Sequence, residues 1–233
     1  MPRPPGPRQL AFALPHADNL TREDFLEGPS NAAALRLVER WPDWPDRVAV
    51  LVGPEGSGKS HLAAIWAEAS GARLLSARAL GEAHLPTALA TGALVIEDLT
   101  PREFDERSLF HLLNLVREHE AFVLVTARAA PAGWTLAIAD LASRLRAPAV
   151  VELAPPDDAL LRAVLIKLFA DRQLPVDESL IGYLVTHLER SFAAARRMVD
   201  TLDREGLRLK RSVTRALAVE TLRRDENGLR SGS

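Results

Sequence analysis

The chain has 233 residues, of which 47% are hydrophobic, a formal net charge of −2 and no cysteine. This length allows one large core or two small ones, and the lack of cysteine excludes disulfides, thiol catalysis and cysteine-ligated metals. The near-neutral charge argues against a protein whose main task is to bind nucleic acid, because such proteins usually carry a basic face. The sequence contains no run of about 18 apolar residues and no signal peptide, so we expect a cytoplasmic protein without a membrane partner.

The chain begins with a proline-rich tail and a short apolar segment. Met1–Pro7 holds four prolines, a composition typical of disorder. The apolar segment Gln9–Leu14 follows and ends before Pro15. It either packs on the body of the protein or docks on a partner as an extended peptide. We therefore treat residues 1–18 as a flexible tail.

Apolar runs then alternate with segments of helical periodicity. The apolar runs predict five strands at Arg47–Val52, Arg73–Ser76, Ala93–Asp98, Ala121–Thr126 and Pro148–Leu153. Helical segments are predicted at 31–40 with Ser30 as the cap, and at 59–69, 79–90, 105–118 and 136–145. Strands that alternate with helices predict an α/β fold, with a parallel sheet covered by helices on both faces.

Beyond Pro155-Pro156 the sequence shows only helical periodicity. Four helices are predicted there, at 159–171, 177–187, 191–204 and 212–223. This change predicts a domain boundary near residue 155. We expect a nucleotide-binding base domain over 19–155, a small all-helical lid domain over 156–224 and a frayed C-terminus over 225–233.

The most specific motif follows the first strand. Residues 53–60 read G-P-E-G-S-G-K-S and match the phosphate-binding loop G-x-x-x-x-G-K-S. The glycines allow backbone N–H groups to turn towards an anion. Lys59 supplies a charge for the β and γ phosphates, Ser60 a hydroxyl for Mg²⁺, and the helix that follows adds its dipole. We therefore predict that the chain binds a nucleoside di- or triphosphate.

Polar residues at the ends of two neighbouring strands supply the second layer of this site. Glu97 and Asp98 stand where a carboxylate would hold Mg²⁺ and another group would orient the attacking water. The usual order is Asp before the second acid, so the longer Glu97 predicts slow or absent turnover. Thr126 ends the next strand and either reaches the γ-phosphate or the attacking water, or makes a local hydrogen bond.

Three arginines are further candidates. Arg144 precedes the fifth strand and either lies on the surface or completes the active site of a neighbouring molecule by stabilising charge on its γ-phosphate. Arg196 and Arg197, in the helical region, either reach a nucleotide across the domain cleft or are solvated helix residues.

Taken together, these residues resemble the DnaA-type AAA+ ATPases, and within them the Hda group of DnaA regulatory inactivators. The similarity runs from about Gln9 to Leu222. Besides the phosphate-binding loop, it rests on the stretches 24–31, 95–98 and 139–145, the last reading A-D-L-A-S-R-L.

The resemblance implies a role for each matching residue. Phe25 and Leu26 would line the adenine pocket, and Glu97 and Asp98 would fill the Walker B positions. Arg144 would be the arginine finger that acts in trans on ATP bound to DnaA. The phosphates of ADP or ATP would be held by Gly53, Pro54, Glu55, Gly56, Ser57, Gly58, Lys59, Ser60 and His61, with Mg²⁺ at Ser60 and Glu97. The sliding clamp of DNA polymerase would be bound by Gln9, Leu10, Phe12 and Leu14, a glutamine followed by spaced apolar anchors.

The sequence departs from the family pattern at three positions. Ala193 stands where the lid arginine that senses nucleotide belongs, and Arg196 or Arg197 would have to replace it. The acid of the sensor-one motif aligns near Arg128, and Glu97 stands in the Mg²⁺ position. We therefore expect a protein that binds nucleotide but hydrolyses it slowly, if at all.

The resemblance implies a negative regulator of replication initiation that meets DNA through the clamp and associates with DnaA, or with itself, through the nucleotide edge. An initiator would carry a further helix-turn-helix domain, whereas about ten residues follow the last predicted helix. A self-sufficient remodelling ATPase or helicase-loader-like adapter would turn over ATP on its own. A plain scaffold would not need Lys59.

Overall fold

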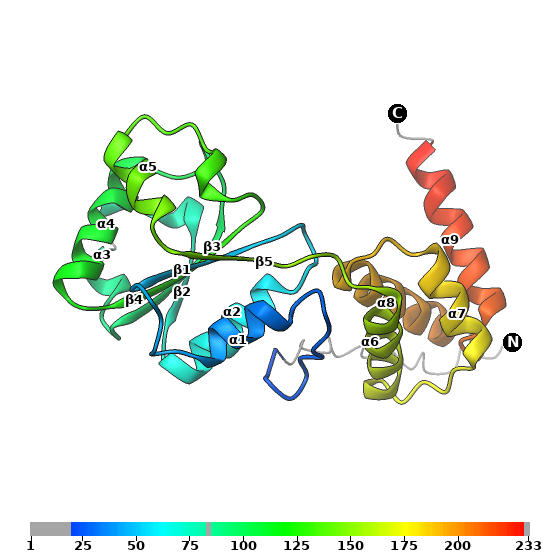
Figure 1. Ribbon diagram of the computed structural model, residues 1–233. Coiled ribbons are helices and arrows are strands. Elements are labelled where there is room, and N and C mark those ends of the chain that lie inside the picture. Colours follow the sequence, from blue (N-terminus) through cyan, green and yellow to red (C-terminus); the bar gives the residue numbers. More distant parts are fainter. Residues whose placement is uncertain (1–19, 83–84, 231–233) are drawn as a thin grey trace, which may run out of the picture.

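The computed structural model describes residues 20–82 and 85–230, apart from the side chains of Pro86 and residues 225–230. The predicted clamp-binding residues Gln9, Leu10, Phe12 and Leu14 lie outside the described residues. Figure 1 shows a sheet part and a helical part, joined by the extended segment between β5 and α6.

The five apolar runs form one parallel sheet with the order β2-β3-β4-β1-β5. The strands are β1 (Val48–Val52), β2 (Arg73–Ser76), β3 (Ala93–Leu99), β4 (Phe122–Ala127) and β5 (Ala149–Glu152). All five predicted strands are confirmed, and no strand end differs from its prediction by more than one residue. In a parallel sheet the carboxyl ends of the strands share one edge. The loops after β1, β3 and β4 therefore meet there.

Helices cover both faces of the sheet, as the sequence predicted (Figure 1). One face carries α1 (Ala32–Glu39) and α2 (Lys59–Ser70). The other carries α3 (Leu85–Ala88), α4 (Glu106–Glu118) and α5 (Ala139–Arg146). The buried side chains of β1 alternate between the two faces, because successive side chains of a strand point to opposite sides.

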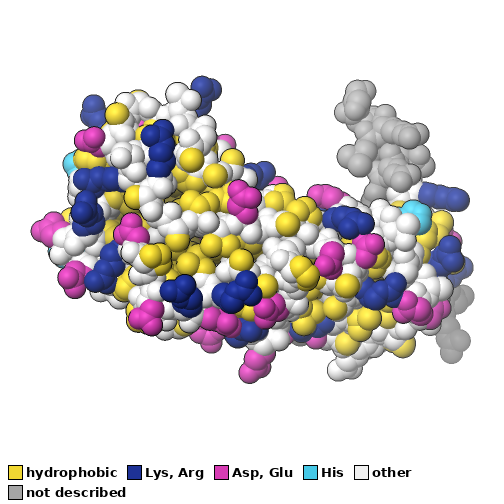
Figure 2. Space-filling model, in the orientation of Figure 1, with side chains coloured by type: hydrophobic (Ala, Val, Ile, Leu, Met, Phe, Trp, Pro, Cys, Tyr) yellow, Lys and Arg dark blue, Asp and Glu magenta, His cyan; other side chains and the backbone are white. Residues whose placement is uncertain are grey.

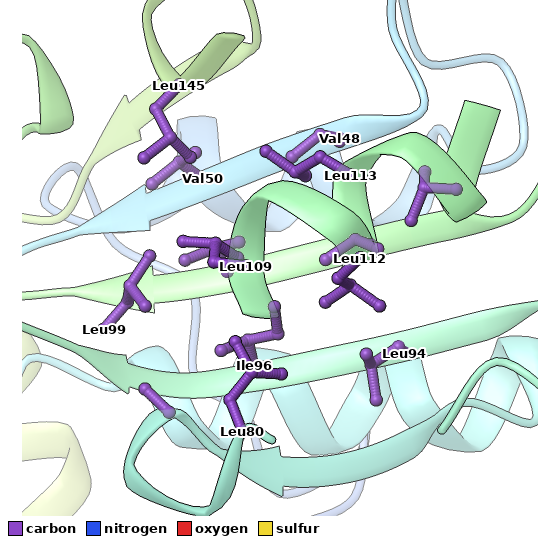
Figure 3. Close-up of a cluster of buried hydrophobic side chains, with 14 of the residues drawn as sticks. Val48, Val50, Leu80, Leu94, Ile96, Leu99, Leu109, Leu112, Leu113 and Leu145 are labelled. Carbon is purple, nitrogen blue, oxygen red and sulfur yellow. The ribbon is translucent and has the colours of Figure 1, made fainter. Parts of the chain in front are cut away.

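Each face has its own kind of core. The face under α4 is aliphatic, and Figure 3 shows Leu109, Leu112 and Leu113 of α4 above the strands. The opposite face contains an aromatic cluster, in which the rings of Trp44 and the fully buried Trp66 stack with centroids 5.1 Å apart.

The helical part comprises α6 (Asp158–Asp171), α7 (Glu178–His187), α8 (Phe192–Leu209) and α9 (Arg215–Arg230). Its buried cluster draws on residues from Leu161 to Ala218, whereas the clusters of the sheet end at Leu153. The buried clusters of the two parts therefore lie on either side of Pro155-Pro156. Side-chain caps begin three of these helices, with Asp157, Asp177 and Ser191 accepting from the backbone.

Several helix ends differ from the prediction. Ser30 does not cap α1: Asn31 occupies the cap position, and its side chain bonds Gly28 N and Leu26 O instead. The predicted helix 79–90 is reduced to the short α3 and a 3₁₀ turn at Ala77–Ala79, because Pro86 cannot donate a helical hydrogen bond. Helix α8 runs to Leu209 and α9 to Arg230, both beyond their predicted ends.

Candidate nucleotide-binding site

The phosphate-binding loop joins β1 to α2 and presses against the helical part. Gly56 and Gly58 have left-handed backbone conformations, with φ of 72° and 99°. A Cβ at Gly56 would lie 2.6 Å from the Ser191 hydroxyl oxygen, and one at Gly53 would lie 2.6 Å from the Leu153 carbonyl oxygen. Gly53 and Gly56 therefore lack a side chain because neighbouring atoms lie too close, and Gly56 and Gly58 also need glycine for their left-handed backbone conformation.

Two side chains of the loop have buried polar atoms, the Lys59 ammonium and the Ser57 hydroxyl. The Lys59 ammonium donates to the carbonyl oxygens of Gly53 and Pro54 at 2.8 and 2.7 Å and is 8% exposed. Burial lowers the pKa of Lys59, while the negative charges of Asp98 and Glu55 oppose that shift. The Ser57 hydroxyl is buried and has no hydrogen-bond partner among the described residues. Phosphate oxygens accept hydrogen bonds, so the glycine cradle and these donors fit a nucleotide phosphate.

The polar residues predicted after β3 and β4 do meet at this edge of the sheet. Asp98 has a φ of 59° at an irregularity in the pairing of β3 with β4, and its amide donates to the Thr126 hydroxyl at 3.0 Å. Thr126 is buried, and its hydroxyl accepts this bond while its own O–H is left to donate. Glu97 is half-buried and pairs in register with Ser76 of β2.

Arg128 adds a positive charge to this edge. Its guanidinium lies 3.2 Å from Glu55 and 3.6 Å from Asp98, measured between nitrogen and carboxylate oxygen. The side chains of all three residues are more than half exposed, so each ion pair is weak on its own. Arg128 nevertheless balances two carboxylates beside the phosphate-binding loop.

A pocket of about 500 Å³ lies between the sheet part and the helical part, next to the loop. Phe25, Leu26 and His61 are among the residues that line it, and the His61 ring meets that of Phe25 edge-on at 5.1 Å between centroids. The His61 Nε2 atom lies 2.8 Å from the Thr21 carbonyl oxygen, and this contact connects α2 to the segment before α1. The apolar side chains of Val164 and Leu168 complete the pocket from α6.

Of the two predicted lid arginines, Arg196 lines the pocket and Arg197 is not among the lining residues. Ala193, at the position of the expected sensor arginine, lies against Gly56. Because Ala193 packs so closely against Gly56, position 193 has little room for a larger side chain such as arginine.

Sequence reasoning missed the part of the pocket that α6 supplies. Lys167 pairs with Asp24 at 2.7 Å and with Asp171 at 2.8 Å, and all three residues line the pocket. The only sequence signal was the i, i+4 spacing of Lys167 and Asp171 on a helix. Asp24 comes from a segment more than 140 positions earlier in the chain, and periodicity does not reveal such a contact.

Arg144 lies apart from this pocket. It is half-buried on α5, where its guanidinium sits 4.7 Å above the Phe110 ring and donates to the Asn114 side-chain oxygen. It does not line the nucleotide pocket of its own chain; it lines a smaller cavity at the amino end of β1.

No protein-family model and no curated protein sequence matches the chain. Solved structures do match. Domain III of the Thermotoga maritima replication initiation protein DnaA superposes with a TM-score of 0.72 at 17% identity, over 89% of this chain and 97% of that one. AMPPCP-bound DnaA from Aquifex aeolicus gives 0.68 at 18% identity, over 91% and 71%. The chain has the AAA+ fold.

A second group of AAA+ neighbours belongs to a different protein. The Thermotoga maritima RuvB Holliday junction branch migration motor gives a TM-score of 0.62 at 17% identity, over 75% of this chain and 60% of that one. At these identities the likeness establishes the AAA+ fold alone. Within the described residues, no helix is long and apolar enough to span a membrane.

Proposed function

We propose that this AAA+ chain is an Hda-like negative regulator of replication initiation, which binds a nucleotide and stimulates hydrolysis of the ATP held by DnaA. The observation that carries the proposal is the separation of two features. The phosphate-binding loop and its pocket lie at one edge of the sheet, and Arg144 lies outside that pocket. This position outside the chain's own pocket supports a role for Arg144 on a nucleotide that another molecule holds.

The proposed ligand of the chain itself is ADP or ATP with Mg²⁺. The amides of the loop and Lys59 would hold the phosphates, and Phe25, Leu26 and His61 would hold the base. Ser60 and Glu97 would hold Mg²⁺, which would neutralise phosphate charge. Arg196 would approach the nucleotide from the helical part, which would serve as a lid.

Slow turnover by the chain itself is part of the proposal. Glu97 stands in the Mg²⁺ position and Arg128 near the position of the sensor-one acid, and both departures from the family pattern support slow hydrolysis. The catalytic contribution would then come from Arg144, acting in trans on DnaA. Recruitment would come from the clamp, through Gln9, Leu10, Phe12 and Leu14.

The test is ATP hydrolysis by purified DnaA-ATP in the presence of this protein, with and without clamp loaded on DNA. We expect clamp-dependent stimulation that falls at least about tenfold on Arg144→Ala, since loss of an arginine finger removes charge stabilisation from the transition state. Gln9→Ala should remove the dependence on clamp. Arg36→Ala, at an exposed position of α1, is the matched control and should act like wild type.

Other outcomes would point elsewhere. Full stimulation by the Arg144→Ala variant would refute the role given to that residue. Steady ATP turnover by this protein alone, without effect on DnaA, would favour a remodelling ATPase. If the protein shows neither activity, the interpretation that remains is a nucleotide-binding scaffold.

A further inference from the structure

The pocket between the two parts has a charged stretch on the side that α6 supplies. There α6 faces the segment before α1 (Figure 1). Val164, Lys167, Leu168 and Asp171 all line the pocket, because residues with the spacing i, i+3, i+4 and i+7 share one face of a helix. Figure 2 shows hydrophobic side chains next to acidic and basic ones on the visible face where the two parts meet. The face that α6 turns to the pocket is therefore both apolar and charged.

Three charged side chains on this side form a hydrogen-bonded row. The Lys167 ammonium donates to Asp24 at 2.7 Å and to Asp171 at 2.8 Å. The other carboxylate oxygen of Asp24 accepts from the Thr21 hydroxyl at 2.8 Å. The hydrogen bonds from Lys167 and Thr21 lower the pKa of Asp24, so this carboxyl is ionised at neutral pH. The row thus presents an acceptor, a donor and a second acceptor in a fixed order.

Each member of the row can make a further hydrogen bond. An ammonium has three N–H donors, and Lys167 uses two of them on the described carboxylates. A carboxylate oxygen accepts more than one hydrogen bond. The side chains of Asp24 and Lys167 are 24% and 26% exposed, and that of Asp171 is 44% exposed. The row is therefore partly shielded from water and still open to a ligand in the pocket.

The apolar neighbours of the row indicate which part of a nucleotide would meet it. Phe25 and Leu26 follow Asp24 in the chain, and Val164 and Leu168 belong to α6; all four line the pocket. Apolar walls with a few placed polar groups are typical of sites that bind a flat organic group. The phosphates would lie on the glycine-rich loop, so the flat group at the row would be the base.

We propose that Asp24, Lys167 and Asp171 recognise the hydrogen-bonding edge of the base and select adenine. Adenine offers an amino donor at C6 and an acceptor at N1, which match Asp24 and Lys167 in order. Guanine offers an oxygen at C6 and an N–H at N1, so that an oxygen would face a carboxylate and an N–H would face an ammonium. This inference rests on the proposed function, which places a nucleotide in the pocket, and adds the residues that select its base.

The third member of the row gives the proposal a distinctive consequence. Asp24 is the less exposed carboxylate, so we assign it to the amino group at C6. Asp171 then faces the C2 position of the base, where adenine carries only a hydrogen. A base with amino groups at both C6 and C2 would match all three members of the row. The protein should therefore bind the 2,6-diaminopurine nucleotide more tightly than ADP.

The first experiment varies the base and leaves the protein unchanged. ADP, GDP and the diphosphates of purine riboside and 2,6-diaminopurine riboside are titrated into the full chain by calorimetry. Purine riboside diphosphate lacks the amino group and should bind about tenfold more weakly than ADP, the effect of one charge-assisted hydrogen bond. GDP should bind at least about a hundredfold more weakly, because two polar groups are mismatched. The 2,6-diaminopurine nucleotide should bind about threefold more tightly, because Asp171 is more exposed than Asp24.

The second experiment tests the residues through a ratio of affinities. Asp24→Ala should bring ADP and purine riboside diphosphate to nearly equal affinity, since the acceptor for the amino group is gone. Asp171→Ala should remove the advantage of the 2,6-diaminopurine nucleotide over ADP. Glu23→Ala, at an exposed carboxylate outside the pocket, is the matched control and should keep both ratios. A contact that only ties the two parts together would weaken all the nucleotides by one factor and leave the ratios unchanged.

The outcomes separate this inference from the proposed function. Equal binding of ADP and purine riboside diphosphate by the wild-type protein would overturn the inference, and so would GDP binding as tight as that of ADP. An Asp24→Ala variant that keeps the tenfold ratio would also overturn it. If none of the four nucleotides binds, the proposed nucleotide site fails and this inference fails with it. If the ratios are as expected and the protein does not stimulate DnaA, the regulatory role fails and the base recognition stands.

Discussion

The glycines of the phosphate-binding loop show how single residues shape the site. Gly56 has a left-handed φ of 72°, and its α-carbon faces Ser191 and Ala193 of the helical part. A side chain at this position would be strained by its backbone conformation and would also collide with α8. The same glycine thus serves both the anion cradle and the contact between the two parts.

Gly56→Ala is therefore expected to destabilise the protein by about 2 kcal/mol and to weaken nucleotide binding. Gly182→Ala is the matched control, because Gly182 lies inside α7 with open space around its missing Cβ. That change should stabilise the protein by about 0.5–1 kcal/mol through helix propensity. Urea denaturation of both variants tests the opposite signs. A Gly56→Ala variant as stable as wild type would contradict the close approach seen here.

At the scale of the element, α8 depends on Ser191, the residue that caps its first turn. Ser191 is buried, and its hydroxyl accepts from the Ala194 amide at 3.0 Å. The same turn places Phe192 N on the Gly56 carbonyl oxygen at 2.8 Å, so the start of α8 is also its contact with the phosphate-binding loop. Loss of the cap would therefore affect both the first turn of α8 and its contact with the phosphate-binding loop.

Ser191→Ala should lower the free energy of unfolding by about 1 kcal/mol, the usual effect of removing a serine cap. Ser212→Ala, at an exposed position between α8 and α9, should change it by less than about 0.5 kcal/mol. Thermal and urea unfolding of the two variants would measure the difference. Equal stabilities would mean that the hydroxyl is not needed to begin the helix.

At the scale of the whole molecule, an ion pair links the sheet part to the helical part across the pocket. Lys167 of α6 binds Asp24, which precedes α1. The hydrogen bond that Lys167 donates to Asp24 lowers the pKa of Asp24, and the hydrogen bonds that Lys167 donates to Asp171 and then to Asp24 raise the pKa of Lys167. Because the folded pKa of Asp24 is lowered, the Asp24 charge stabilises the folded state above about pH 4, and this stabilisation is lost as pH falls through the folded pKa. Because the folded pKa of Lys167 is raised, its contribution is present below about pH 10 and is lost as pH rises through it.

Asp24→Asn should therefore cost about 1 kcal/mol of stability at pH 7, and the difference from wild type should shrink as pH is lowered towards 3. Asp43→Asn, at an exposed position before β1, is the control and should show no such pH dependence. Unfolding free energies measured across this range give the result. A difference that stays constant down to pH 3 would show that the Asp24 charge is not what matters.

Nucleotide binding between the two parts should stabilise the whole chain. At about 100 times its Kd, ADP is expected to add about 2.7 kcal/mol by mass action and to raise Tm by about 5–10 °C for a chain of this size. Lys59→Ala should remove most of this rise, and Lys210→Ala, at an exposed residue after α8, should retain it. An undiminished rise with Lys59→Ala would show that the loop lysine does not contribute to binding.

The sequence alone determined the α/β class, all five strands and the position of the phosphate-binding loop. Buried strands and amphipathic helices leave local periodic patterns, and the G-x-x-x-x-G-K-S spacing is contiguous. Phe25 and Leu26, which the family resemblance assigned to an adenine pocket, line the pocket between the two parts, and so does His61, which the resemblance assigned to the phosphates. The roles assigned to Glu97, Arg144 and the N-terminal segment stay predictions.

Only the tertiary structure decided which distant residues share a surface. Lys167 of α6 binds Asp24, which precedes α1, and Arg128 after β4 pairs with Asp98 of β3 and with Glu55 of the phosphate-binding loop. The second contact forms because parallel strands bring their carboxyl ends to one edge of the sheet. Helix ends were also decided there: Asn31 bonds the preceding turn, and α8 and α9 extend past their predicted ends. Side-chain hydrogen bonds and tertiary packing outweigh local propensity at such positions.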